Sequence, residues 1–323
     1  MKNFSCVLSE FVKDRKVNIS ALSSETGIER TLLHKFISGT RTPSDIKIVL
    51  KLSEGLMLSC DEKENLCSSY RFTSLGEEGY ENCRTAQRIF STLSNFSRPD
   101  IFKECISAEK LIPSVIYDRL SVSLTIHRMI SESSCKRILI ISPPLYSNIS
   151  GELTAACMSR PEISIIQILS FSPCDAGRNL KTLEKILPLL LFCDDYTPLI
   201  NYSRTSETDS ILPNIIITEK YAFCFSRECD RGILHTRSDI LKFYRNSFDR
   251  TAEKTPELIF RKISDSPEFS DAALKLSNNL YIENDDKKMS LVFRTGSFWS
   301  SILIYEQSLR KSLKESASLV LSL

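Results

Sequence analysis

The most constraining feature of this chain is a series of short helical stretches near its N-terminus, separated by glycines. Apolar residues recur at helical spacing over four ranges: 5–15, 19–26, 29–38 and 45–57. Asn18 is placed to cap the second helix, Gly27 provides a tight turn after it, and Gly39 ends the third. A polar loop closed by Pro43 precedes the fourth helix, for which Ser44 is the expected cap. We therefore predict an all-α domain over residues 1–60.

Residues 22–43 read LSSETGIERTLLHKFISGTRTP and resemble the helix-turn-helix of the Cro/repressor type, also called the XRE family. Leu22 stands at the buried position of the first motif helix, and Gly27 stands in the turn. Residues 38–43 match the loop with which the family ends the motif. The resemblance covers residues 5–58, and it implies a domain that binds double-stranded operator DNA.

Two positions depart from the family pattern. Ser23 stands where alanine is usual at the close crossing of the two helices, and Ile37–Ser38 replaces a common polar–Asn pair. Serine is small enough for the crossing, so neither change overturns the resemblance. Glu29, at the start of the second motif helix, would repel phosphate, although a carboxylate also suits a helix N-terminus.

The resemblance also assigns positions to the DNA contacts. A helix that enters the major groove presents outward residues of its N-terminal part to base edges, and these are Arg30, Thr31, His34 and Lys35. Arg30 suits bidentate binding of guanine. Four flanking residues are placed for contacts to the sugar-phosphate backbone: Thr40 and Arg41 after the second helix, and Asn18 and Ser20 at the start of the first.

The charge distribution gives only weak support for a nucleic-acid partner. Residues 1–60 hold nine Lys and Arg against six Asp and Glu, whereas the whole chain has a net charge of +2. Any basic face is therefore concentrated at the N-terminus, but the bias is small.

Residues 61–99 are charged and helical in character, with a break expected near Gly76–Gly79. They also carry several large apolar side chains: Tyr70, Phe72, Leu75 and Tyr80. We expect a helical linker that packs on another part of the protein or on a second copy of the chain. The run 97–100 (SRPD) marks the expected boundary.

Residues 100–323 are predicted to form an α/β domain with a mixed sheet. Continuous Ile- and Leu-rich runs, typical of strands covered on both faces, occur at 137–142, 163–169, 214–218, 221–226 and 232–236. Helices are expected at 100–111, 114–133, 151–159, 178–192 and 239–248. The strand–helix–strand order predicts parallel pairing, and residues 214–236 predict a meander. Further on, we expect a strand at 291–294 and a helix at 298–314.

Residues 215–226 (IIITEKYAFCFS), 232–236 (GILHT) and 238–250 (SDILKFYRNSFDR) resemble the sensor domains of some bacterial regulators. The sheet of those domains is related to the phospholipase D architecture. The HxK signature of that enzyme class is absent from this sequence. The resemblance therefore implies a catalytically silent sensor domain.

Candidate chemistry in the C-terminal part is sparse. Its two histidines, His127 and His235, are expected to be structural, and no GxGxxG, P-loop, GxSxG or HExxH motif occurs. Cys224 and Cys229 form a metal or redox site only if they meet residues 193–195 (CDD), which more simply mark a helix end. We expect no catalytic residue, no metal site and no cofactor.

Eleven scattered cysteines without a CxxC pair favour free thiols in a reducing compartment. The N-terminal residues lack the apolar core of a signal peptide, and no apolar run approaches the length of a membrane helix. We therefore expect a cytoplasmic protein without a membrane partner.

These features favour a transcriptional regulator, not an enzyme. One such helix-turn-helix makes too few phosphate contacts for tight binding at physiological salt, so we expect a homodimer joined through residues 61–320. The α/β domain would dimerise, sense a small-molecule or peptide effector, or do both. Two alternatives stay open: a nuclease or hydrolase with its active site in residues 100–323, and a helical domain that binds protein.

Overall fold

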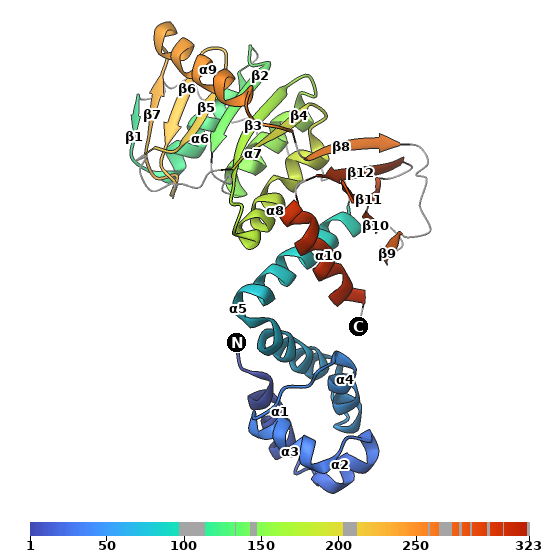
Figure 1. Cartoon of the computed structure of the whole chain (residues 1–323). Coiled ribbons are helices and arrows are strands. Elements are labelled where there is room, and N and C mark those ends of the chain that lie inside the picture. Colours follow the sequence, from blue (N-terminus) through green and yellow to red (C-terminus); the bar gives the residue numbers. More distant parts are fainter. Residues whose placement is uncertain are drawn as a thin grey trace. The chain divides into compact units, whose positions relative to one another are not determined.

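A computed structural model describes most of the chain: residues 1–96, 114–132, 134–142, 147–202, 212–257, 259–264, 273–277, 280–284, 286–295, 298–305 and 307–321. These residues divide into two compact units, Met1–Arg84 with Ser316–Leu323, and Thr85–Glu315. Figure 1 labels their helices and strands. The helix predicted at 100–111 and the boundary predicted at 97–100 lie outside the described residues.

The N-terminal unit is helical, as predicted. Its helices are α1 (Phe4–Asp14), α2 (Ile19–Thr26), α3 (Arg30–Ser38), α4 (Ile46–Gly55) and the start of α5 (Cys60–Ser94). Their inward faces form one apolar core, built mainly from Phe4, Leu8, Leu22, Leu33, Phe36, Val49, Leu52 and Leu66. Burial of these side chains supplies the main driving force for folding of the unit.

Local signals set the helix boundaries. The Asn18 side chain accepts hydrogen bonds from the backbone N–H groups of Ser20 (2.9 Å) and Ala21, as expected of an N-cap. Gly27 (φ 69°) and Gly39 (φ 76°) are both left-handed and end α2 and α3. Helix α4 begins one residue later than predicted, because Asp45, not Ser44, caps it.

Helix α5 contains the predicted break. Gly76 has φ 73° and ψ 175°, a conformation that is accessible to glycine and interrupts the helix. Before the kink, Thr73 Oγ1 accepts a hydrogen bond of 2.8 Å from the backbone N–H of Phe4. The first part of α5 is thus tied to the start of α1.

The larger unit is built on a mixed seven-stranded sheet with the order β1-β7-β6-β5-β2-β3-β4. Its strands are β1 (Val115–Ile116), β2 (Arg137–Ser142), β3 (Ser164–Phe171), β4 (Tyr196–Tyr202), β5 (Asn214–Ile217), β6 (Ala222–Phe225) and β7 (Gly232–His235). Strands β2, β3 and β4 are parallel, and β5, β6 and β7 form the predicted antiparallel meander. The mixed sheet is therefore confirmed, although β4 was not predicted.

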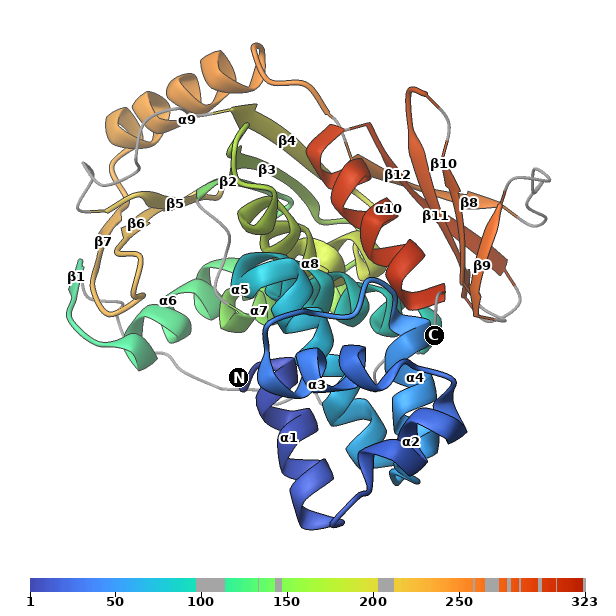
Figure 2. The same ribbon diagram turned by 60° about the horizontal axis from the view of Figure 1, so that its bottom comes forward.

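Helices cover both faces of this sheet. They are α6 (Arg119–Ser131), α7 (Ser147–Ser159), α8 (Ala176–Phe192) and α9 (Ser238–Ala252). Figure 2 shows α9 on one face and α6, α7 and α8 on the other. Under α9, Leu241 and Phe248 pack with Leu139, Ile168 and Ile217 of the sheet. Coverage on both faces explains why the strands read as continuous apolar runs.

A second, antiparallel sheet follows, with the order β8-β12-β11-β10-β9. Its strands are β8 (Ile259–Ser264), β9 (Leu274–Ser277), β10 (Leu280–Asn284), β11 (Met289–Thr295) and β12 (Phe298–Ile304). The predicted strand at 291–294 lies within β11. The helix predicted at 298–314 is wrong in its first half, because residues 298–304 pair with β11 and residues 299–304 pair also with β8. The helix α10 (Gln307–Leu321) begins only after this strand.

In the part of the chain that the structure describes, no helix combines the length and apolar character needed to cross a membrane.

Candidate nucleic-acid interface

The turn between α2 and α3 is held by the buried side chain of Thr26. Its hydroxyl donates to the Leu22 carbonyl (2.7 Å) and accepts from the backbone N–H of Ile28 (3.3 Å). Leu22, Leu33 and Phe36 are each at most 1% exposed, so α2 and α3 share one core. The position of α3 is therefore fixed by packing and by the hydrogen bonds of the Thr26 hydroxyl to the backbone.

Ser23, the residue that departs from the alanine of the family pattern, has a structural role. Its hydroxyl donates a hydrogen bond of 2.7 Å to the carbonyl of Ile28 across the turn. The hydroxyl thereby satisfies a backbone acceptor. The departure thus adds a contact that alanine would lack.

Two glycines allow close approaches in the same unit. A Cβ on Gly39 would lie 2.9 Å from Ser5 Oγ of α1, in addition to requiring a left-handed backbone. A Cβ on Gly55, at the end of α4, would lie 2.6 Å from Thr26 Cγ2 and 3.0 Å from Leu22 Cδ1. Sequence reasoning missed Gly55, because nothing local shows that α2 approaches this helix end.

Helix α3 presents three of the predicted contact residues outward and without partners. Arg30, His34 and Lys35 are exposed, and none of their side chains has a hydrogen bond or ion pair with another described residue. Thr31 is also exposed, but its hydroxyl donates to the Glu29 carboxylate. The carboxylate that would repel phosphate is thus held beside the first turn of α3.

The loop after α3 folds back on the end of that helix. The Thr40 hydroxyl lies 3.3 Å from the Lys35 carbonyl, to which it donates, and 3.0 Å from Ser38 Oγ. The backbone N–H of Arg41 donates to the same Lys35 carbonyl (3.2 Å), and the exposed Arg41 guanidinium has no partner among the described residues. The loop therefore places a cation close to the C-terminal end of α3.

The other two predicted contact residues, Asn18 and Ser20, are exposed at the start of α2. The side-chain oxygen of Asn18 accepts the capping hydrogen bonds, so its side-chain NH₂ group is left to donate to a ligand. The Ser20 carbonyl accepts from Ser24 Oγ (3.1 Å). Lys47, exposed in the first turn of α4, is a further cation that sequence reasoning did not include.

The residues considered for a catalytic site are not brought together. His235 lies in β7, and Asp194 and Asp195 precede β4. Four strands separate β7 from β4 in the sheet, which corresponds to about 24 Å at the usual strand spacing. His127 instead pairs with Glu152 of α7, at 2.7 Å between Nδ1 and Oε2.

The cysteines considered for a metal or redox site are also apart. The Cys224 thiol lies 3.2 Å from the Tyr244 hydroxyl of α9, and the Cys193 thiol lies beside that of Cys157. Cys229 belongs to the β6–β7 loop, where its thiol contacts the Arg227 carbonyl, and burial raises its pKa to about 11. Across the described ranges, no group of three or more His, Cys, Asp and Glu side chains is arranged to hold a metal ion.

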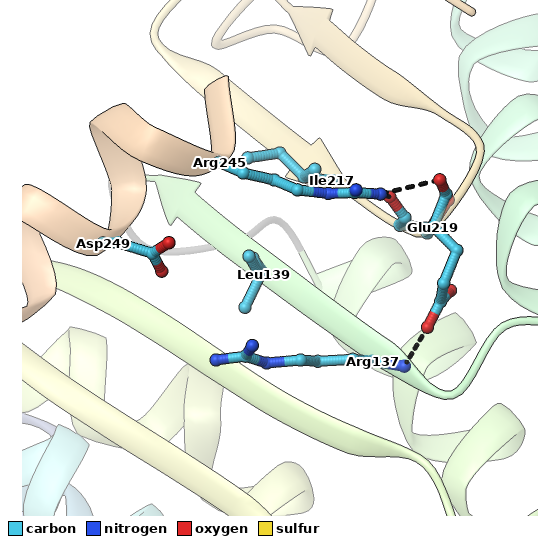
Figure 3. A pocket seen from close by; sticks show the side chains of 7 residues that line it. Arg137, Leu139, Ile217, Glu219, Arg245 and Asp249 are labelled. Carbon is cyan, nitrogen blue, oxygen red and sulfur yellow. Dashed lines mark hydrogen bonds between the residues drawn. The ribbon is translucent and has the colours of Figure 1, made fainter. Parts of the chain in front are cut away.

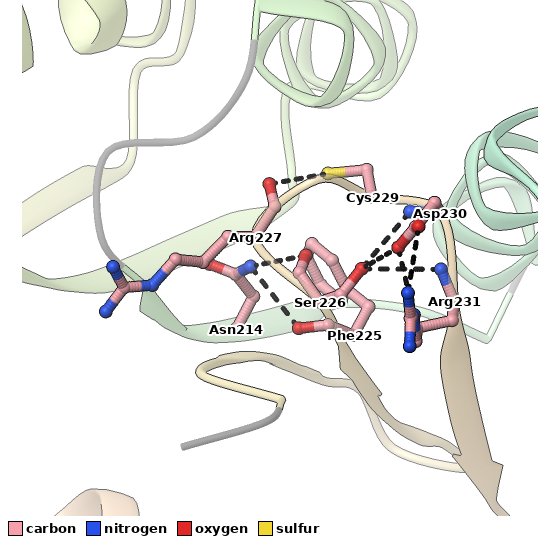
Figure 4. A network of polar contacts seen from close by, with 7 residues as sticks. All are labelled: Asn214, Phe225, Ser226, Arg227, Cys229, Asp230 and Arg231. Carbon is pink, nitrogen blue, oxygen red and sulfur yellow. Dashed lines mark hydrogen bonds and ion pairs between the residues drawn. The ribbon is translucent and has the colours of Figure 1, made fainter. Parts of the chain in front are cut away.

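Figure 4 shows that the β6–β7 loop is instead ordered by a polar network. The Ser226 hydroxyl donates to Asp230 (2.6 Å) and accepts from the backbone N–H groups of Asp230 and Arg231. The hydrogen bond from Ser226 holds the pKa of Asp230 below its ordinary value. These contacts close the hairpin, and Asn214 of β5 donates to its Ser226 carbonyl (2.9 Å).

Comparison with known proteins gave no match, either to a protein-family model or to a curated protein.

Proposed function

We propose that the chain is a sequence-specific DNA-binding transcriptional regulator of the Cro/repressor helix-turn-helix type. In this proposal α3 is the recognition helix, and the unit formed by residues 85–315 dimerises the protein, senses an effector, or does both. The resemblance of residues 22–43 to the XRE family motivates the proposal. Arg30, His34 and Lys35 would meet base edges, and Arg41, Thr40, Asn18 and Ser20 would contact the DNA backbone.

One observation carries the proposal. A helix whose inward face is fully packed presents outward cations that no described residue neutralises. Exposed cations without partners are free to displace counterions from a polyanion, which is the main source of affinity for DNA. Thr31 is less available to donate to DNA, because its hydroxyl already donates a hydrogen bond to the Glu29 carboxylate.

The test is selection of bound DNA from a random pool, followed by titration of the selected duplex at several salt concentrations. We expect the full chain to enrich a defined sequence. Arg30→Ala should weaken binding by about 1–3 kcal/mol and relax the base preference at one position. Lys35→Ala should reduce affinity and change the slope of log affinity against log salt, by about one if it contacts a phosphate.

Lys63→Ala provides the matched control, because it removes one positive charge from α5 of the same unit without altering α2 or α3. If this variant loses as much affinity as Arg30→Ala, the binding is a general charge effect. Unchanged affinity, salt slope and sequence preference in the Arg30→Ala/Lys35→Ala double variant would show that α3 is not the recognition helix.

We also propose that the regulator is a homodimer, since two such domains can occupy paired half-sites about one helical turn apart. Sedimentation of the full chain at micromolar concentration tests this. A dimer is expected, together with a selected DNA site of two-fold symmetry. A monomer bound to an asymmetric site would overturn the dimer while leaving DNA binding by α3 in place.

A further inference from the structure

The larger unit contains a small pocket between the sheet and α9. It has a volume of about 250 Å³, and its lining residues come from the start of β2, the end of β5 with the turn that follows it, and α9: Arg137, Leu139, Ile217, Thr218, Glu219, Arg245 and Asp249. Figure 3 shows Leu139 between the two arginine side chains, with Asp249 toward one end and Glu219 toward the other. The volume is below that typical of sites for drug-sized ligands, so a small metabolite is the suitable size class.

Two of the four charged residues are fixed by the fold. Arg245 donates to the carbonyls of Thr218 (2.8 Å) and Glu219 (2.6 Å), which holds α9 against the turn after β5. The Glu219 carboxylate accepts from the backbone N–H groups of Lys136 (3.0 Å) and Arg137 (2.9 Å). Arg245 and Glu219 are therefore held in place on the pocket lining, and hydrogen bonds to the backbone already partly satisfy their charges.

The other two charged residues are free to bind a ligand. The guanidinium of Arg137 and the carboxylate of Asp249 have no hydrogen bond or ion pair with any residue that the structure describes. Both side chains are exposed to solvent at the pocket, on either side of the apolar floor that Leu139 provides. The pocket thus offers one free cation and one free anion near the same apolar surface.

We propose that this pocket binds a small amphoteric molecule, an apolar α-amino acid. Its carboxylate would pair with Arg137, its ammonium with Asp249, and its side chain would contact the small part of Leu139 that is exposed (5%), while Ile217, at 1% exposed, only closes the base of the pocket. The lining holds two cations and two carboxylates, so its net charge is zero. A simple anion would be attracted by Arg137 but repelled by Asp249, whereas a zwitterion satisfies both groups.

The position of the pocket allows a bound ligand to affect how α9 packs on the turn after β5. It lies against α9 and against the turn that follows β5, two elements already joined by Arg245. As the effector site of a regulator this pocket rests on the proposed function. Binding of the amino acid does not depend on that function. It is measured without DNA, so a chain that failed to bind DNA could still bind the amino acid.

Isothermal titration of the full chain with leucine, isoleucine, valine, methionine and phenylalanine tests the proposal. At least one is expected to bind, and the tightest is then compared with its carboxamide and its N-acetyl derivative. Each derivative lacks one charge and should bind at least about tenfold more weakly. If none of the five binds at millimolar concentration, or if inorganic phosphate binds more tightly than all of them, the proposal is wrong.

Two variants test which pocket residue binds each charged group of the amino acid. Arg137→Gln should remove the preference for the amino acid over its carboxamide, and Asp249→Asn should remove the preference over the N-acetyl derivative. Lys242→Gln in α9 and Glu253→Gln at its C-cap make the same charge changes at exposed positions outside the pocket lining, and should leave both preferences intact. Preferences that survive in both pocket variants would place the bound amino acid elsewhere.

Discussion

The outward face of α3 and the pocket beneath α9 both present arginines, but in opposite electrostatic settings. On α3 the cations have no described partner, and the nearby Glu29 carboxylate is engaged by Thr31. In the pocket Arg245 is held by two carbonyls, and two carboxylates balance the two guanidinium groups. Uncompensated charge suits a polymer whose affinity falls steeply with salt, whereas balanced charge selects a net-neutral small molecule.

The two sites also differ in how they are built. The α3 face depends on a packed helix within one short stretch of the chain. The pocket depends on the antiparallel pairing of β2 with β5 and on the packing of α9 over both strands. Changes to each unit should therefore affect its own site and spare the other.

The largest effect is expected from Phe36→Ala. Phe36 is 1% exposed in the core beneath α3, and loss of a buried phenylalanine costs about 3–5 kcal/mol. That is comparable to the whole stability of a small domain. Denaturant unfolding should show an early transition of the N-terminal unit, with DNA binding lost and amino-acid binding retained. Met57→Ala, at a position 77% exposed, should change stability by less than about 0.5 kcal/mol. Loss of amino-acid binding in the Phe36 variant would break the independence of the two sites.

An intermediate effect is expected from Gly55→Ala. The added Cβ would meet Thr26, whose side chain is fixed by hydrogen bonds on both sides of the turn. Overpacking of this kind should destabilise the unit by about 1–2 kcal/mol, despite the better helix propensity of alanine. Gly151→Ala in α7 has no atom within 4 Å of the new Cβ, so there the same change should stabilise by up to about 1 kcal/mol. Equal shifts in melting temperature for both variants would contradict the close approach of α2 and α4.

A smaller effect is expected from Arg245→Met, which retains the length of the side chain but removes its donors. The carbonyls of Thr218 and Glu219 would each lose a hydrogen bond. Because the site is half-buried, the two losses together should lower the free energy of unfolding by about 1 kcal/mol. Hydrogen exchange should speed up in the turn after β5, and amino-acid binding should weaken. Exchange that is unchanged in this turn would show that Arg245 does not hold α9 to it.

The smallest effect is expected from Lys220→Met. The hydrogen bond from Lys220 lowers the pKa of Glu132 below its ordinary 4.5. A carboxyl whose pKa is lower in the folded than in the unfolded chain stabilises the fold at neutral pH, and this contribution is lost as the pH falls through the folded pKa. The variant should therefore be slightly less stable at pH 7, and the difference should shrink below pH 4.5 and disappear once the pH is below the lowered pKa of Glu132. If the difference in stability persists or grows in acid, it comes from changed packing and not from the hydrogen bond of Lys220 to Glu132.

The helices of the N-terminal unit could be predicted because their signals act over a few residues. Asn18 caps the helix that follows it, and Gly27 and Gly39 end the helices that precede them. The contacts of Arg30 and Lys35 with DNA stay predictions. The pocket could not be predicted, because Arg137 and Asp249 are far apart in sequence and meet only through the pairing of β2 and the packing of α9.

The strand β12 shows why a helix was predicted there instead. Trp299, Ile302 and Leu303 recur at a spacing that also fits one face of a helix. Pairing with β8 and β11 on its two sides fixes the segment as a central strand and leaves Ile302 and Ile304 fully buried. Pairing partners from other segments override such a local pattern.

The two left-handed glycines at the ends of α2 and α3 have a thermodynamic consequence. Gly27 ends α2 and Gly39 ends α3, and Leu33 and Phe36 pack α3 into the core of its own unit, so the helix is formed before any partner binds. Association through α3 therefore does not carry the ordering entropy of coupled folding. The heat-capacity change on binding DNA should match the surface buried at the interface alone, with no additional contribution from helix formation.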